Sequence, residues 1–267
     1  MQIGISTAAF YGKAETEQAA QVIGQMGADC MEAFLQCHFE HHGAFGQILK
    51  DMAGKTEVRS IHVLSSRDEP GLFSKSLRQR QAALETLCGA LDAGQAAGAR
   101  YYVLHGQAFP KGMPVGLPNY DRLAECIEPL VNAARARGIW IAWENVWWSS
   151  FRTPEFAVEM AKRLPEIRFT LDIKQAAKTQ YGWRSFLDAM GERLVNVHVC
   201  DEDEMGALCL PGRGKFDFDA LAQALRAIGY QDAVILEPYP ELFDAPEQLI
   251  QAAEFLKAKF DGGKRRI

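Results

Sequence analysis

Short apolar runs recur about eight times along this chain, and longer segments with helical spacing of their apolar residues separate them. Such alternation is typical of strand–helix units arranged around a parallel sheet. About eight units within 267 residues fit a (β/α)8 barrel, and no linker divides the sequence. We therefore expect an α/β protein with one domain over residues 1–267, a single (β/α)8 TIM barrel.

The same pattern predicts the approximate position of each element. Strands are expected at Ile3–Ser6, Cys30–Leu35, Val58–Val63, Tyr101–Leu104, Ile139–Trp143, Ile167–Leu171, Leu194–Val197 and Ala233–Leu236. Helices are expected near Thr16–Met26, Ser76–Ala97, Tyr120–Arg137, Pro154–Arg163, Trp183–Met190, Phe218–Ile228 and Pro246–Lys259.

The last four predicted strands each end at a side chain that can bind a metal ion. These side chains are Glu144, Asp172, His198 and Glu237. The carboxyl ends of barrel strands converge on one mouth, and three carboxylates gathered there repel one another unless a cation lies between them. The pattern therefore predicts a site for one divalent ion, with ordinary loop caps as the alternative. Mixed oxygen and nitrogen ligands suit manganese, cobalt, zinc or magnesium.

Two histidines lie beside this predicted site. His62 falls within the third strand, and His105 follows the fourth. A histidine on a strand is more often a satisfied core residue than a ligand. Two of them near the ends of adjacent strands favour a functional contact. Glu32, within the second strand, either contacts a ligand inside the barrel or is paired there.

A third group of histidines follows the second strand. His38, His41 and His42 lie there, and the first and last are four residues apart, as two ligands on a helix would be. No apolar pattern supports a helix at these positions. We therefore prefer a polar surface loop over the barrel mouth.

Aromatic and basic side chains give further candidates for substrate contact. Trp143, Trp147 and Trp148 flank the first predicted ligand, and tryptophan faces suit the apolar side of a sugar ring. Trp143 is therefore a candidate, although these rings can equally pack helices onto the barrel. Arg213 lies in a glycine-rich turn after the seventh strand. Because loops there often bind phosphate, Arg213 either meets an anionic or hydroxyl-rich substrate or is a solvated turn residue.

Charge and hydropathy exclude several classes of partner. A net charge of −5 disfavours nucleic acid, because polyanion binding usually requires a basic surface. No apolar run is long enough for a membrane span, and the start of the chain reads directly as a strand, so we expect a cytoplasmic protein without a membrane partner. Six cysteines without a C-x-x-C pair fit reduced thiols.

The chain resembles a known family, the xylose isomerase-like TIM barrels, a superfamily of sugar phosphate isomerases and epimerases. The resemblance spans nearly the whole chain. It rests on Trp143-Glu144-Asn145, Leu171-Asp172, Val197-His198-Val199 with Asp201, Pro211-Gly212-Arg213-Gly214 leading to Asp217-Phe218, and Glu237-Pro238. In the similar ketose 3-epimerases, Glu, Asp, His and Glu bind a divalent metal, and both Glu residues move the proton. The resemblance thus implies that Glu144, Asp172, His198 and Glu237 bind metal and that Glu144 and Glu237 are catalytic.

One position departs from the epimerase pattern. Those enzymes usually have a substrate-binding histidine three residues after the sixth-strand Asp, whereas this chain has Gln175 there and Lys174 just before it. The resemblance places Gln175 at the substrate. Lys174 is a substrate-binding cation, an acid or base, or the partner of a nearby carboxylate, since a desolvated lysine shifts its pKa readily.

The chain is also similar, more distantly, to endonuclease IV, which cuts DNA at abasic sites with three zinc ions. His62, His105 and Glu144 match one zinc site of that enzyme, and the four predicted metal ligands match a second. The third site fails, because Gln175 replaces its histidine and no Asp-x-His follows the seventh strand. DNA repair is therefore disfavoured, but His62 and His105 can still hold a second metal ion or bind sugar hydroxyls.

These observations lead to a hypothesis for function. A ketose or related polyhydroxy carbonyl compound chelates the metal, which stabilises an enediolate as a Lewis acid while Glu144 and Glu237 transfer the proton. Return of the proton to the same carbon gives epimerisation, and return to the neighbouring carbon gives isomerisation. The alternatives are a metal-dependent hydrolase or dehydratase and a barrel that only binds a small molecule. The resemblance also allows a homo-oligomer.

Overall fold

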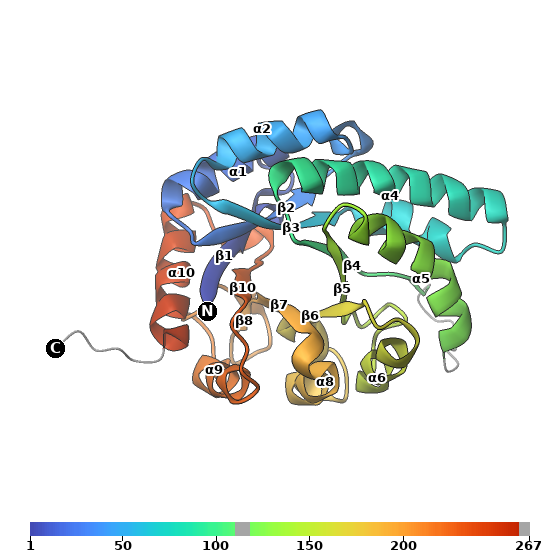
Figure 1. The fold of residues 1–267 in the computed structure, drawn as a ribbon. Helices are drawn as coiled ribbons and strands as arrows, with labels where there is room; N and C mark the ends of the chain where they lie inside the picture. Colours follow the sequence, from blue (N-terminus) through green and yellow to red (C-terminus); the bar gives the residue numbers. More distant parts are fainter. Residues whose placement is uncertain (110–117, 262–267) are drawn as a thin grey trace.

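A closed barrel of eight parallel strands forms the centre of the molecule, with helices around it (Figure 1). The computed structural model describes residues 1–109 and 118–261. The barrel strands are β1 (Gln2–Ser6), β2 (Cys30–Leu35), β3 (Glu57–Val63), β4 (Tyr101–Leu104), β5 (Trp140–Glu144), β6 (Arg168–Asp172), β7 (Leu194–Val199) and β10 (Ala233–Leu236). Each pairs with its neighbours in chain order, and β10 closes the barrel against β1. The predicted (β/α)8 barrel is therefore confirmed.

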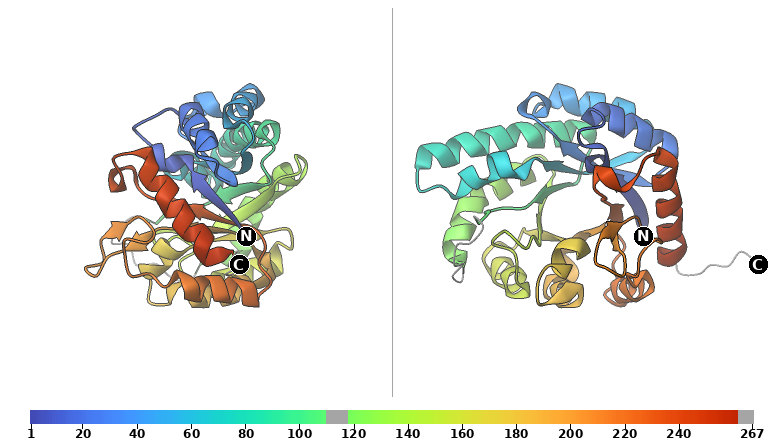
Figure 2. Two further views of the ribbon diagram at one scale, coloured as in Figure 1. Left: turned by 90° about the vertical axis from the view of Figure 1, so that its left-hand side faces the viewer. Right: turned by 180° about the vertical axis from the view of Figure 1, so that it is seen from behind.

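Helices cover the outside of the barrel in all three views (Figures 1 and 2). The longer helices are α1 (Thr16–Met26), α2 (Gly43–Ala53), α4 (Leu77–Ala97), α5 (Tyr120–Arg135), α6 (Pro154–Arg163), α8 (Gly182–Met190), α9 (Phe218–Ala227) and α10 (Pro246–Phe260). Two short helices, α3 (Ser65–Asp68) and α7 (Ile173–Ala177), begin close to the ends of β3 and β6. No helix in residues 1–109 and 118–261 is long and apolar enough to cross a membrane.

Side chains alternate along each barrel strand between the helix layer and the barrel interior. On β5, Ile141 and Trp143 belong to the main apolar core, whereas Glu144 faces inward. On β7, Val197 and Val199 pack outward, and the inward side carries polar residues. The core therefore lies between strands and helices, while the upper part of the barrel interior is polar.

Three features differ from the sequence-based expectation. Helix α2 was not predicted, and it begins directly after the histidine-rich segment. Helix α7 begins at the residue after Asp172, whose carboxylate caps it by accepting the N–H of Gln175 (2.9 Å). A small hairpin of β8 (Asp201–Glu202) and β9 (Leu208–Cys209) lies beyond β7.

Candidate metal centre and active site

The four predicted metal ligands meet inside the barrel mouth. Glu144 ends β5, Asp172 ends β6, His198 lies in β7, and Glu237 follows β10. The Nδ1 atom of His198 lies 3.6 Å from Oε2 of Glu144 and 3.4 Å from Oε2 of Glu237. Ligand atoms of Glu144, Asp172 and His198 all lie within 4.8 Å of one another. The strand ends thus bring together the donor set that the sequence predicts.

Two atoms of this group test whether it fits a metal ion. His198 Nδ1 and Asp172 Oδ2 are both buried, and neither makes a hydrogen bond within the described residues. Their neighbours are charged groups: Lys174 Nζ lies 3.2 Å from Asp172 Oδ2, and two carboxylate oxygens lie 3.4 and 3.6 Å from His198 Nδ1. Leaving buried atoms without hydrogen bonds is costly unless a further partner completes them. A divalent ion between two or three carboxylates and one imidazole nitrogen satisfies both atoms and offsets the repulsion. The residues therefore fit the group that the sequence implies.

A second layer of polar side chains supports His198 from below. Glu32, fully buried in β2, accepts hydrogen bonds from Ser60 Oγ (2.7 Å) and Asn196 Nδ2 (3.0 Å). Its Oε2 also lies 3.1 Å from His198 Nε2. A carboxylate on one imidazole nitrogen fixes the ring orientation and leaves the other nitrogen available to a metal. Of the two roles considered for Glu32, the structure thus shows a paired carboxylate.

The two strand histidines lie against the first of the four acids. His105 Nε2 is 3.0 Å from Glu144 Oε2, and the rings of His62 and His105 cross edge to face at 4.5 Å. Burial and the neighbouring His105 lower the pKa of His62 to about 4, so that its imidazole is neutral. For His105, burial opposes the charged form, but Glu144 overcomes this and raises the pKa to about 9. His62, His105 and Glu144 also form a group with metal-ligand spacing.

Glu69 supports this group, and the sequence reasoning missed it. Its buried carboxylate accepts the backbone N–H groups of His105 (3.0 Å) and Gly106 (2.8 Å) and the hydroxyl of Tyr102 (3.2 Å). Burial raises the pKa of Glu69 to about 7. Gly106 adopts φ 78°, and a side chain there would clash with the ring of Trp143. Glu69 therefore holds the turn that directs His105 into the mouth.

Lys174 pairs with two of the predicted metal ligands. Its Nζ lies 2.8 Å from Glu237 Oε2 and 3.2 Å from Asp172 Oδ2, and the side chain is almost entirely buried. Burial opposes the charge of Lys174, but Asp172 and Glu237 outweigh it and raise the pKa of the ammonium. Burial raises the pKa of Asp172 to about 6, although Lys174 opposes the shift. The salt bridge considered for Lys174 is thus present, and it joins α7 to Asp172 at the end of β6 and to Glu237 just after β10.

A cavity of about 250 Å³ opens above these groups at the mouth. Its polar lining comes from His62, His105, Glu144, Lys174, Gln175 and Glu237. Its apolar walls include Tyr11, Phe34, Leu64, Trp148 and Tyr239. The cavity thus combines groups that can transfer protons with walls formed largely by aromatic side chains.

Two predicted substrate contacts lie outside this cavity. Trp143 is fully buried and packs against Phe156 with ring centroids 4.9 Å apart, because it alternates with Glu144 and faces the helix layer. Arg213 is exposed and is not one of the residues that line the mouth. We therefore transfer the predicted ring contact to Trp148, whose ring meets His105 edge to face at 5.4 Å.

The glycine-rich turn that carries Arg213 is organised by Asp201. This buried carboxylate accepts the backbone N–H groups of Gly212 (3.1 Å), Gly214 (3.0 Å) and Phe216 (2.9 Å). A side chain at Gly214 would lie 2.2 Å from the carbonyl oxygen of Glu202. The Pro-Gly-Arg-Gly pattern therefore has a structural cause, the close approach of this turn to the β8–β9 hairpin.

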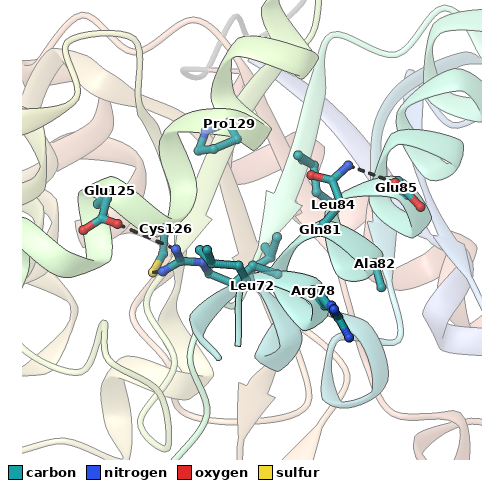
Figure 3. A pocket seen from close by; sticks show the side chains of 11 residues that line it. Leu72, Arg78, Gln81, Ala82, Leu84, Glu85, Glu125, Cys126 and Pro129 are labelled. Carbon is teal, nitrogen blue, oxygen red and sulfur yellow. Dashed lines mark hydrogen bonds and ion pairs between the residues drawn. The ribbon is translucent and has the colours of Figure 1, made fainter. Parts of the chain in front are cut away.

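A larger pocket, of about 680 Å³, lies on the outside of the barrel beside α4 and α5 (Figure 3). Arg80 pairs with Glu125 at this pocket, with its Nη2 atom 3.8 Å from Oε1 of Glu125. Leu72, Leu84 and Pro129 contribute apolar surface. None of its described lining residues belongs to a group with metal-ligand spacing. The chemistry is therefore concentrated in the smaller cavity at the mouth.

Comparisons with known proteins agree with this architecture. The sequence profile of the xylose isomerase-like TIM barrel matches residues 20–259. The structure is similar to that of a D-psicose 3-epimerase in the presence of D-fructose, with TM-score 0.82, 18% identity, and 98% of this chain and 100% of that chain covered. It is also similar to 3-keto-D-glucoside 4-epimerase YcjR from E. coli, with TM-score 0.77, 18% identity and coverage of 97% and 99%.

A third solved structure, an IolI protein with a bound zinc atom, has TM-score 0.75 and 17% identity, and both chains are covered completely. At these identities the solved structures establish the fold, and the sequence profile, which spans most of the chain, establishes the family. The chain belongs to the xylose isomerase-like TIM barrel family.

Proposed function

We propose that this protein is a divalent-metal-dependent isomerase or epimerase of a ketose or a related polyhydroxy carbonyl compound. The observation that carries the proposal is that Glu144 and Glu237 both reach His198 Nδ1, with their Oε2 atoms 3.6 and 3.4 Å from it. Two carboxylates that face one position can remove and return a proton at one carbon. The sugar epimerases with similar structures support the same chemistry.

One divalent ion, held by Glu144, Asp172, His198 and Glu237, would act as a Lewis acid on the substrate carbonyl. Manganese, cobalt, zinc and magnesium all suit these ligands. The chain's own groups perform the proton transfer. One of Glu144 and Glu237 removes the proton alpha to the carbonyl, and the other, after taking up a proton from solvent, supplies it from the opposite face. Which of them is the base depends on the handedness of the substrate.

The side chains around the two acids set their protonation. His105, 3.0 Å from Glu144, helps to hold the pKa of that carboxyl well below its usual range, against the effect of burial. Lys174, 2.8 Å from Glu237, lowers the pKa of Glu237, also against burial. Both carboxylates are therefore ionised at neutral pH, and each has a neighbouring cation that can stabilise charge near the substrate. In this proposal Lys174 acts by stabilising the ionised form of Glu237.

The cavity supports a small, uncharged substrate. About 250 Å³ is enough for a single sugar, and His62 and Gln175 offer groups that bind hydroxyls. Gln175 Oε1 is buried and has no hydrogen-bond partner in the part of the chain that the structure describes. Lys174, the lysine in the described cavity lining, is already paired with two carboxylates. We therefore favour a neutral sugar over a sugar phosphate.

A second candidate function follows from the group formed by His62, His105 and Glu144. Their ligand atoms lie within 4.8 Å of one another, so a second ion can share Glu144 with the first. Two adjacent ions would activate water for hydrolysis, and a single ion can promote dehydration. The presence of His105 as a hydrogen-bond partner of Glu144 favours the one-ion arrangement.

The cytoplasmic location and the homo-oligomer expected from the sequence stay predictions.

The proposal is tested by solvent-deuterium exchange. The protein, loaded in turn with each of the four metals, is incubated with a panel of ketoses in D2O and followed by NMR. We expect deuterium at the carbon alpha to the carbonyl together with an epimer or isomer, and neither with Glu237→Gln. Turnover without exchange would exclude proton transfer, and a hydrolysed or dehydrated product would establish the second candidate. Ketose binding without any turnover, unchanged in Glu237→Gln, would identify a binding protein.

A further inference from the structure

A second group of ligand-type side chains lies outside the barrel, in the loops that follow β2 and β3. Nε2 of His38 lies 2.7 Å from Oδ1 of Asp68, and the rings of His38 and His41 are 5.3 Å apart. One ligand atom from each of these residues lies within 4.8 Å of the others. We propose that His38, His41 and Asp68, called here the outer cluster, bind a zinc-type divalent cation that ties the two loops together. This proposal is independent of the proposed function.

The turn that carries the two histidines is fixed by its other side chains. Glu40 is buried, and its carboxylate accepts the hydroxyl of Thr16 (3.0 Å) and the N–H of Gln36 (2.5 Å). His42 caps α2, because its Nδ1 accepts the N–H of Phe45 (3.1 Å). The Nδ1 atom of His42 thus already accepts a hydrogen bond, so we do not include His42 among the ligands. The sequence spacing suggested His38 and His42 as a pair, whereas the fold pairs His38 with His41.

His41 is held against α4 in a form suited to binding a cation. Its carbonyl oxygen would lie 2.5 Å from a side chain at Gly89, so only glycine permits this approach. Burial lowers the pKa of the His41 imidazole, which is therefore neutral at neutral pH, and the ring also interacts with the backbone of Thr86. Its Nδ1 is buried, and no described residue provides a hydrogen-bond partner for it. The His41 ring thus keeps one nitrogen without a hydrogen bond among the described residues, and one of its ligand atoms lies close to His38 and Asp68, so the ring is able to bind a cation there.

The donor set and its spacing select the class of ion. Two imidazoles and one carboxylate suit zinc, cobalt, nickel or copper, whereas magnesium and calcium prefer oxygen ligands. In a tetrahedral site with metal bonds of about 2.0–2.1 Å, donor atoms lie roughly 3.3 Å apart. The distance of 2.7 Å between His38 Nε2 and Asp68 Oδ1 and the upper limit of 4.8 Å for all ligand atoms of the outer cluster lie on either side of this value. Small side-chain rotations at exposed His38 would therefore complete three bonds and leave one position for water.

An ion in the outer cluster would brace a segment that reaches the mouth. Asp68 directly precedes Glu69, which accepts the backbone N–H groups of His105 and Gly106. Leu64, just before α3, lines the mouth cavity. Fixing Asp68 to the β2–α2 loop therefore restrains the segment that positions His105. We infer a structural ion, because its ligands do not line the cavity.

The test is zinc binding by equilibrium dialysis in a Glu144→Gln/His198→Ala background, which removes a ligand from both barrel groups described above. We expect about one zinc per chain, bound at least tenfold more weakly by His38→Gln and by Asp68→Asn. His42→Asn, which keeps a cap for α2, is the matched control and should bind within twofold of the parent. Zinc should also slow hydrogen exchange of residues 67–73 in the parent and not in His38→Gln.

No zinc in the Glu144→Gln/His198→Ala protein would overturn the proposal, as would equal affinity in His38→Gln or an equal loss in His42→Asn. Circular dichroism of each variant separates lost ligands from lost folding, and exposed His38 is the change least able to unfold the chain. Failure of the barrel metal site leaves this result untouched, since that site is absent from the background used.

Discussion

The two halves of the barrel mouth differ in charge, although both are built from strand-to-helix loops. The half made by β5, β6, β7 and β10 brings two carboxylates to the cavity, Glu144 and Glu237, and Asp172 is buried close to them. In the half made by β1 to β4, the described lining residues include no carboxylate and are mainly apolar or imidazole side chains: Ala8, Tyr11, Phe34, His62, Leu64 and His105.

This difference assigns separate tasks to two parts of one fold. The acidic half holds a cation and moves a proton, whereas the other half shapes the wall against which a substrate lies. Two residues cross the boundary. Glu32 comes from β2 but orients His198, and His105 comes from β4 but pairs with Glu144. The division between the two halves can therefore be tested at the carboxylates of the acidic half and at Glu32 and His105.

The largest expected effect lies in the acidic half. Glu237→Gln keeps the size of the side chain but removes its ability to accept a proton, so turnover should fall by roughly 10³-fold. The measurement is steady-state kinetics on the ketose identified by deuterium exchange. Exposed Glu241→Gln, four residues along, is the matched control and should retain full turnover. Comparable turnover of Glu237→Gln would remove the proposed division between the halves.

The second effect concerns Glu69, which supports His105. Its folded pKa of about 7 exceeds the ordinary value of 4.5, so the folded state binds the proton more tightly. The associated stability is present below pH 4.5 and is lost as the pH rises to 7. We expect the wild type to lose up to about 3 kcal/mol of unfolding free energy across this range, relative to Glu69→Gln. Urea unfolding at several pH values measures the difference, and parallel curves for the two proteins would contradict it.

A third, smaller effect tests the link through Glu32. Removing this carboxylate leaves His198 unoriented, so Glu32→Ala should weaken metal binding by about 10–100-fold. Glu32→Gln still accepts a hydrogen bond and should restore part of the affinity. Calorimetric titration with manganese gives both values. Unchanged affinity in Glu32→Ala would show that the β1 to β4 half contributes nothing to the metal centre.

The smallest effect concerns the cavity wall. Trp148 lines the mouth, whereas Trp147 is partly exposed and lies outside it. Trp148→Leu should raise KM by roughly fivefold with little change in kcat, because it removes ring contact with substrate before and during reaction. Trp147→Leu should change neither. Equal KM values for the two variants would reject Trp148 as a wall of the substrate site.

Sequence reasoning succeeded where local pattern and function coincide. The eight barrel strands lie within a few residues of their predicted positions, because buried strands leave uninterrupted apolar runs. The same runs end at Glu144, Asp172, His198 and Glu237, and the structure brings these side chains together.

Other features depend on tertiary contacts that spacing does not reveal. Helix α2 was missed because Gly43 and Gly46 weaken its pattern, yet a side chain at Gly46 would meet the carbonyl of Ala93 on α4 at 2.0 Å. Glu69 lies on a short 3-10 helix that follows α3, and only the fold shows that it holds the backbone of His105 just after β4. Trp143 is buried in the core, whereas Trp148 lines the mouth cavity, and the sequence alone does not show which of the two rings reaches the cavity.

The most direct test of the barrel site is metal content by elemental analysis, in an Asp68→Asn background that removes the outer cluster. After loading with manganese, cobalt, zinc or magnesium, this protein should retain about one equivalent, and adding Glu144→Gln or His198→Ala should remove most of it. Retention of the full equivalent in both variants, or no bound metal after loading with any of the four ions, would contradict the account.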